Sequence, residues 1–275
     1  MSWRKKKKQI KHIKHKVILI ISLMFTVVIG LSIFLVFKFT NKEESFKVES
    51  RVENVEKNRK IADSDFEVVG WLRVQGTEID FPILYTENSE TVFPVKLESF
   101  VWTNNDSKDF SSQIFIEGHN IFNLSAQPKI SSESFHRFEQ LMAFTYYDFA
   151  KKNEYIQLTW NDKDYVYKIF SVGFINTSEA SFFPGYGSNV KEKIKFQENS
   201  VKNKSIYDYD VDVDENDKLI SLSTCTRFFG LNNGIEFSVT GRLLRDDEKI
   251  EHYKVTKNSN YNEIEKKLKG DEDNE

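Results

Sequence analysis

The sequence predicts a mainly β domain, a closed barrel or a sandwich, preceded by one transmembrane helix. Three observations lead to this prediction. Short apolar runs are separated by turn residues at regular intervals through the middle of the chain. Aromatic residues make up 14% of the 275 residues and include 24 Phe, which suits a β-rich core. A long charge-free run follows a basic N-terminus, which is the pattern of a membrane anchor.

The N-terminus predicts a signal anchor that is not cleaved. Residues 1–16 carry eight Lys or Arg and no acidic residue, and residues 17–37 carry no charge. About 21 apolar residues can cross a hydrocarbon core of roughly 30 Å. Because the run exits directly into Lys38 without the small-residue site of a signal peptide, we expect it to stay in the membrane. The positive-inside rule then puts residues 1–16 in the cytoplasm and the rest outside.

The charge of the exported part limits its partners. With the eight basic residues of the N-terminus set aside, 31 Lys or Arg stand against 42 Asp or Glu, so residues 17–275 carry a net charge of −11. This acidic balance argues against nucleic acid as a ligand. The chain has one cysteine, so a hydrophobic core must hold the fold without an internal disulfide. The domain, expected at 65–246, is long enough for one such core.

The first expected strands are short and end at turn residues. Residues 68–74 form a strand that turns at Gly76. Residues 79–85 form an edge or irregular strand, because Pro82 has no N–H to donate. Residues 113–117 form a strand that ends at a glycine.

A hairpin and two further strands are expected in the second half of the domain. Residues 155–160 and 165–174 are rich in β-formers, and the polar turn 161–164 separates them. The last strands are expected at 219–225 and 235–244, with a glycine- and asparagine-containing loop between them.

Helical and irregular segments are expected around these strands. Residues 38–64 predict a linker that contains a partly amphipathic helix or is a solvated stalk. Residues 134–147 start as a helix, because Phe and Leu recur on one face, and residues 190–200 predict a short helix. Residues 247–275 are highly charged and predict a tail that ends in disorder.

Cys225 is the candidate nucleophile. A lone cysteine is either a small buried hydrophobe or a free thiol that is kept for its chemistry. The thiolate is the reactive form, and a neighbouring imidazole can act as a base and later as an acid toward a leaving amine. His119 follows an apolar strand and a glycine, where a barrel rim presents a side chain. His136 lies within the expected helix and is more typical of a structural residue.

Acyl transfer also needs a group that stabilises the oxyanion, such as backbone N–H groups or a guanidinium. The arginines that follow the cysteine are Arg227, Arg242 and Arg245.

The alternating acids at 208–217 do not form a calcium loop. Such a loop needs a glycine at its sixth position and a glutamate at its twelfth, and a loop that starts at Asp208 or Asp210 has neither. The alternation predicts a solvated face of an extended segment. We expect no metal and no cofactor.

Four motifs, in order along the chain, resemble those of the sortase family, class B in particular. Residues 68–72 with 76–83 resemble the start of that class, and residues 118–120 (GHN) resemble its G-H-[NH] motif. Residues 205–208 (SIYD) resemble the S-x-Y-D region, and residues 221–225 (SLSTC) resemble T-L-x-T-C with Ser for the first Thr. The likeness covers roughly residues 65–244.

The resemblance implies a closed β-barrel of about eight strands with flanking helices. It implies a membrane-anchored cysteine transpeptidase on a Gram-positive-type cell surface. Such an enzyme cleaves a sorting signal in a secreted protein, forms a thioester at Cys225 with the help of His119, and passes the acyl group to an amine. The amine belongs to peptidoglycan or to a pilin.

One position departs from the family pattern. Sortases carry an arginine on the strand after the cysteine, and Glu236 stands there in this chain. A carboxylate cannot stabilise an oxyanion. Arg227 would point to the same face as Cys225 if the strand geometry persists, so we hypothesise that it supplies the positive charge. Alternatively, Arg227 pairs with an acid such as Glu236, or a gap at 230–234 brings another residue into place.

Two other functions stay open at this point. A membrane-anchored assembly scaffold could use the same barrel, with its activity weakened by Glu236. A papain-like Cys/His cell-wall peptidase is disfavoured, because such enzymes usually place the cysteine before the histidine and at a helix N-terminus.

Overall fold

The computed structural model describes a large part of the chain. The described residues are 24–27, 29–30, 32, 46–59, 67–85, 101–103, 113–118, 120, 137–176, 201–230 and 234–272. The chain divides into two compact units, Met1–Glu44 and Ser45–Glu275. The expected helix at 190–200 and most of the expected anchor at 17–37 lie outside the described residues.

In the N-terminal unit the described positions are helical and leave large apolar side chains such as Met24 and Phe25 exposed. Among the described residues, no helix combines the length and the apolar character needed to span a bilayer.

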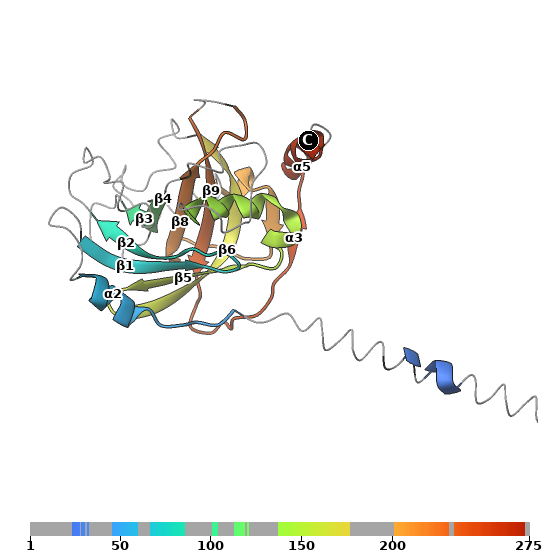
Figure 1. Cartoon of the computed structure of the whole chain (residues 1–275). Helices are drawn as coiled ribbons and strands as arrows, with labels where there is room; N and C mark the ends of the chain where they lie inside the picture. The colour runs from blue at the N-terminus through green and yellow to red at the C-terminus, as the bar shows by residue number, and fades with distance from the viewer. Residues whose placement is uncertain are drawn as a thin grey trace, which may run out of the picture. The chain divides into compact units, whose positions relative to one another are not determined.

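The second unit is built on a closed β-barrel (Figure 1). Within the described residues, its strands follow one another around the barrel in the order β1-β2-β3-β4-β8-β9-β6-β5, and β5 pairs with β1 to close it. The strands are β1 Glu67–Val74, β2 Asp80–Tyr85, β3 Val101–Thr103, β4 Gln113–Gly118, β5 Tyr155–Trp160, β6 Lys163–Asn176, β8 Leu219–Cys225 and β9 Ile235–Leu243. The expected barrel is therefore confirmed, and a sandwich is excluded.

Helices and two short strands lie around the barrel (Figure 1). They are the helices α2 Val52–Arg59, η2 Arg137–Thr145, α3 Tyr147–Ala150 and α5 Tyr261–Glu272, and the strands β7 Tyr207–Tyr209 and β10 Val255–Lys257. β7 and β10 pair as a two-stranded antiparallel sheet. η2 is a 3-10 helix that packs against β6, β8 and β9, where the sequence indicated only the start of a helix.

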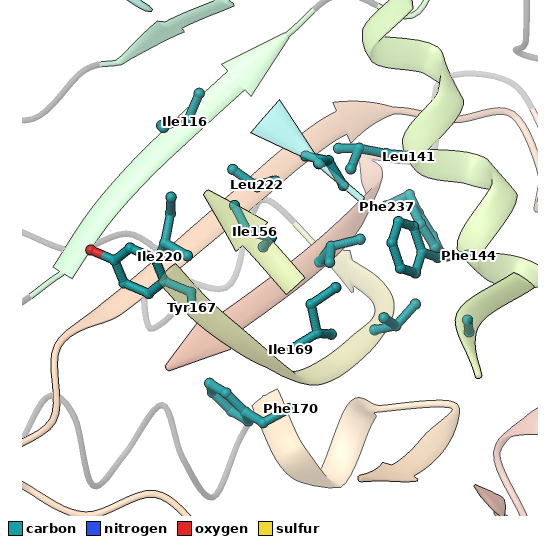
Figure 2. Close-up of a cluster of buried hydrophobic side chains, with 14 of the residues drawn as sticks. Ile116, Leu141, Phe144, Ile156, Tyr167, Ile169, Phe170, Ile220, Leu222 and Phe237 are labelled. Atoms are coloured by element: carbon teal, nitrogen blue, oxygen red, sulfur yellow. The ribbon is translucent and has the colours of Figure 1, made fainter. Parts of the chain in front are cut away.

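The core fills the barrel and the space beneath η2. Figure 2 shows the centre of this cluster. Its members include Ile116, Leu141, Phe144, Ile156, Tyr167, Ile169, Phe170, Ile220, Leu222 and Phe237. β5 is buried at every position and β8 at every position but its last. The alternation in β8 therefore marks large and small buried residues rather than a buried and a solvated face.

Two expectations about local structure need adjustment. The hairpin between β5 and β6 turns on two residues, Asn161 and Asp162, with positive φ angles of 49° and 59°, and Lys163 already pairs with Trp160. Positive φ at both central residues is what a type I′ turn requires. β2 is no edge strand, since β1 and β3 flank it. Within the described residues its pairing with β3 starts at Ile83, so Pro82 lies just outside that ladder and its missing N–H is not needed there.

The ends of the domain extend beyond 65–246. Before β1, Phe46 stacks on Tyr155 with ring centroids 5.7 Å apart, and Arg51 forms an ion pair of 2.7 Å with Asp80. After β9, the segment expected to be a charged tail forms β10 and α5, because its few apolar residues recur at helical spacing and are buried, namely Tyr261, Ile264 and Leu268.

Candidate active site

Cys225 is the exposed end of a buried strand. The six residues of β8 before it, Leu219 to Thr224, are buried, whereas Cys225 is exposed. The buried strand thus fixes the backbone that carries the thiol, and the side chain of Cys225 at its end stays accessible. Such a position suits a reactive thiol better than a structural one, which would be buried.

β4 lies parallel to β8 and brings the GHN motif to the cysteine. Gly118 pairs with Thr224, and the Thr224 hydroxyl donates to the Gly118 carbonyl at 2.7 Å. The side-chain amide of Asn120 donates to the Cys225 carbonyl at 2.8 Å. His119, between these two residues in the chain, lies outside the described residues, as does His136.

Gly118 is required by close packing at the end of β4. A Cβ atom at this position would overlap the ring of Phe138 on η2, closer than real Cβ contacts allow. The glycine of the motif therefore lets η2 pack directly on the strand end that leads into His119.

β9 brings a carboxylate to the other side of the cysteine. Cys225 pairs with Glu236 in the antiparallel ladder, and directly opposite residues have Cβ atoms about 5 Å apart. Ser223, two residues earlier on the same face of β8, donates a hydrogen bond to the Glu236 carboxylate. The position that carries arginine in the family pattern is thus occupied by an acid beside the thiol.

The electrostatics of the site oppose ionisation of the thiol. Although Cys225 is exposed as a residue, its thiol is partly desolvated, and this desolvation raises its pKa. The negative charges of Glu236 and Glu117 raise the pKa further. Because the thiolate is the nucleophile, a cationic group near Cys225 would be needed to offset these two carboxylates.

Arg227 has the orientation expected from strand alternation. Cys225 and Arg227 are exposed, and Thr226 between them is buried. In the described part of the chain, no ion pair joins Arg227 to an acid, and Glu236 contacts Ser223 instead. A turn follows directly, in which the Gly230 N–H donates to the Arg227 carbonyl at 2.9 Å. Gly230 has a φ of +109°, which favours glycine.

The other two candidate arginines stand at the opposite end of the sheet. Arg242 pairs with Leu219, six residues before Cys225 on β8, or roughly 20 Å along the strand. It is 1% exposed and forms an ion pair with Glu248. Arg245 forms an ion pair of 2.7 Å with Asp217. Both arginines are committed to structural ion pairs and are excluded as partners of the thiol.

The acidic segment before β8 is extended with one solvated face, as the alternation of its residues predicted. Asp208, Asp210, Asp212 and Asp214 are exposed, and the Tyr and Val residues between them are buried. Asp217 differs, because its pairing with Arg245 lets it be buried. Among the described residues, no group of His, Cys, Asp or Glu is arranged to hold a metal ion.

A pocket of about 360 Å³ lies beside the site, between the end of β6, the start of β9 and α5. Phe229 and Ile235, from the loop after Cys225 and the start of β9, form part of its wall, and Asn260 and Glu263 contribute from the α5 side. The sequence analysis missed the α5 wall of this pocket, because that wall belongs to the segment expected to be a tail.

Two site residues were not singled out in the sequence. Asn120 could have been predicted, because it is the third residue of the GHN motif. Ser223 lies in the cysteine motif, but its bond to Glu236 depends on the register between β8 and β9, which no local pattern reveals.

Solved structures of sortase B share this fold. Clostridium perfringens sortase B is 23% identical with a TM-score of 0.55, covering 69% of this chain and 100% of that one. A sortase B solved in complex with triglycine is 18% identical with a TM-score of 0.54, covering 78% and 93%. Sortase B from the type II pilus of Streptococcus pneumoniae is 16% identical with a TM-score of 0.52, covering 72% and 98%. No protein-family model and no curated protein sequence matches the chain.

Proposed function

We propose that this chain, which has the fold of the class B sortases, is a membrane-anchored cysteine transpeptidase. The observation that carries the proposal is the exposed thiol at the end of a buried strand, directly beside the strand end that leads into the GHN motif. A purely structural cysteine would need neither the exposure nor the neighbouring motif.

The reaction proceeds in two acyl transfers. The Cys225 thiolate attacks the carbonyl carbon of the scissile peptide bond in a sorting signal, the C–N bond breaks, and His119 gives a proton to the leaving amine. An acceptor amine then attacks the thioester, the C–S bond breaks, and its proton passes to His119. The thiolate is regenerated, so protons balance over the cycle.

The role of His119 is supported by its neighbours in the chain. Gly118 and Asn120 both bond to the end of β8, through Thr224 and through the Cys225 carbonyl. His119 stands between these two residues in the sequence, which is why the proposal assigns it the acid and base role.

Arg227 supplies the positive charge in this proposal. It stands on the same side as Cys225, two residues on, and its guanidinium would stabilise both the thiolate and the oxyanion. The charge is needed because Glu236 and Glu117 raise the pKa of the thiol.

The acceptor is a primary amine, and the domain is exported. Because one sortase B of this fold was solved with triglycine and another comes from a type II pilus, the acceptor is an oligoglycine cross-bridge or a pilin amine. Residues 17–37 anchor the chain in the membrane and residues 1–16 stay in the cytoplasm, as the basic flank indicates.

One observation favours a second function. Glu236 raises the pKa of the thiol on which catalysis depends, which fits an assembly scaffold of low activity on the same barrel. Turnover measurements separate the scaffold from the enzyme.

The test is transfer of a set of C-terminal sorting-signal peptides to triglycine by the full chain. Cys225→Ala should abolish transfer, His119→Ala should lower its rate about 10²–10⁴-fold, and Arg227→Ala about 10²–10³-fold. The matched controls are His136→Ala and Arg59→Ala, which should retain nearly full rates. Transfer by Cys225→Ala at the wild-type rate would refute the proposal, and a near-full rate for Arg227→Ala would remove that residue from it.

A further inference from the structure

We propose that the C-terminal helix α5 positions the loop that follows the nucleophile, through Lys267. The loop is residues 226–230, here called the Arg227 loop. The inference rests on the proposed function, because it gives α5 a part in the same reaction. Lys267 is a positioning residue, since its contacts are with the backbone and rings of the loop.

The backbone of the Arg227 loop is held at successive points. The Cys225 carbonyl accepts from Asn120 at 2.8 Å. The Phe228 N–H donates to the Thr226 hydroxyl at 3.1 Å, and the Gly230 N–H donates to the Arg227 carbonyl at 2.9 Å. The first of these contacts comes from Asn120, two residues after β4 ends, whereas the other two lie within the loop and cannot fix it relative to the barrel.

Lys267 provides a second external contact. Its ammonium group donates to the Phe228 carbonyl at 3.0 Å. The same ammonium lies 5.5 Å from the ring centroid of Phe228 and 5.5 Å from that of Phe229, within the range of cation–π attraction. Arg227 thus stands between a contact from Asn120 on one side and a contact from Lys267 on the other.

The two phenylalanines connect this contact to the barrel. Phe228 is 1% exposed, and its ring lies 5.0 Å from that of Phe174 on β6. Phe229 packs edge-on against Phe174 with ring centroids 4.8 Å apart. Lys267 therefore lies over the aromatic cluster and also donates a hydrogen bond to the backbone of Phe228, which belongs to that cluster.

α5 has contacts of its own with the rest of the domain, through a buried face and through the residue that precedes it. Its apolar face is buried through Tyr261, Ile264 and Leu268. Just before the helix, the side chain of Asn260 donates to the carbonyls of Asn203 and Ser205 at 2.8 and 2.9 Å. A support that is anchored independently of the loop can restrict the loop's motion, which is what positioning a transition-state group requires.

The test compares Lys267→Met with Lys266→Met in the full chain. Met keeps the length and the apolar stem but removes the donor and the charge, and Lys266 is exposed on the same helix. We expect Lys267→Met to lower kcat for peptide transfer about tenfold with little change in KM, the scale of one lost hydrogen bond to a charged group. Lys267→Arg should restore most of the rate, and Lys266→Met should behave as wild type.

Two further readouts identify how Lys267 acts. Trypsin should cleave after the exposed Arg227 several times faster in Lys267→Met than in Lys266→Met, because the loop has lost its outer contact. In an Arg227→Ala background, Lys267→Met should add little further loss of kcat, since both changes act on the same group.

Equal tryptic cleavage in the two variants would overturn the inference whatever the activity shows. Faster cleavage with an unchanged kcat would overturn it too, because the loop would be held without consequence for the reaction. Activity that persists in Cys225→Ala would refute the proposed function instead. The rates of tryptic cleavage would then still show whether Lys267 restrains the Arg227 loop.

Discussion

At the scale of single residues, Cys225 stands in surroundings that work against its proposed role. The thiol has a carboxylate opposite it on β9, and this carboxylate is one cause of its raised pKa. Removing a negative charge beside a thiol favours the thiolate. Glu236 is therefore one of the groups that raise the pKa of the thiol, after desolvation and beside Glu117.

Glu236→Gln should lower the pKa of Cys225. The Coulombic effect of a carboxylate on the thiol is lost, while an amide can still accept from Ser223. The pH profile of Cys225 alkylation by iodoacetamide should move to lower pH, and the rate at pH 7 should rise a few-fold. Glu56→Gln, on the exposed side of α2, is the control and should leave the profile unchanged. A profile that stays in place in Glu236→Gln would contradict this electrostatic account.

The residues of the site differ in how far the sequence could predict them. Cys225 could be chosen because it is the lone cysteine at the end of an alternating run, and Arg227 follows from alternation at two residues' distance. Lys267 could not, because nothing in a charged segment distinguishes the lysine that meets the Phe228 carbonyl from its neighbours.

At the scale of elements, one end of the β8–β9 ladder holds the thiol, and the other end holds a buried ion pair. Near the end of β8, Cys225 is exposed and faces Glu236. Near its start, Arg242 on β9 is buried and bonds Glu248, which also accepts from the backbone N–H of Arg245 and from Lys168. The ion-pair network fixes the end of the ladder that is remote from the thiol.

Glu248→Ala should destabilise the protein in a pH-dependent way. Hydrogen bonds from Arg242 hold the pKa of Glu248 well below its usual range, so its stabilisation is present above the ordinary glutamate pKa of about 4.3 and lost as pH falls toward the lower folded-state pKa. At pH 7 the loss should be about 3 kcal/mol, because the buried Arg242 loses its nearest carboxylate and keeps only the more distant Asp212 at 3.6 Å.

Urea unfolding at several pH values measures this effect. The gap between wild type and Glu248→Ala should narrow as the pH drops below about 4, and the exposed Glu251→Ala should change little at any pH. A gap that stays constant down to low pH would show that the carboxylate's charge is not what stabilises the ladder.

The strands themselves were largely predictable from the sequence. Short apolar or β-rich runs bounded by turn residues indicated β1, β2, β4, β5, β6, β8 and β9. The turn at Asn161 and Asp162 could also be anticipated, since both residues tolerate positive φ. β3, β7 and β10 were missed because each spans three residues, too few for a periodic pattern.

At the scale of the whole molecule, the decisive feature is the parallel pairing of β4 with β8. These strands are about a hundred residues apart in the chain, and their pairing brings Gly118 beside Thr224. Local patterns predict strands but not which strands become neighbours, so the meeting of the two motifs followed only from the resemblance to a known family. The fold now supplies the physical reason for it.

The C-terminal segment belongs to the same cooperative unit as the barrel, and Ile264→Ala tests this. Ile264 is 2% exposed, so its truncation should cost about 2–5 kcal/mol of global stability. Lys266→Ala, on the exposed side of α5, should stay within about 0.5 kcal/mol. Circular dichroism and tryptophan fluorescence should report one shifted urea transition. Separate transitions for helix and barrel would contradict the single unit.

The central claim is that Cys225 carries an acyl group during turnover. Its most direct test is intact-protein and peptide mass spectrometry after acid quenching of the full chain with sorting-signal peptides and no acceptor. We expect a mass increase equal to the acyl fragment on the peptide that contains Cys225, released by hydroxylamine and absent from Cys225→Ala. Absence of any adduct, under conditions where iodoacetamide alkylates Cys225, would contradict the account.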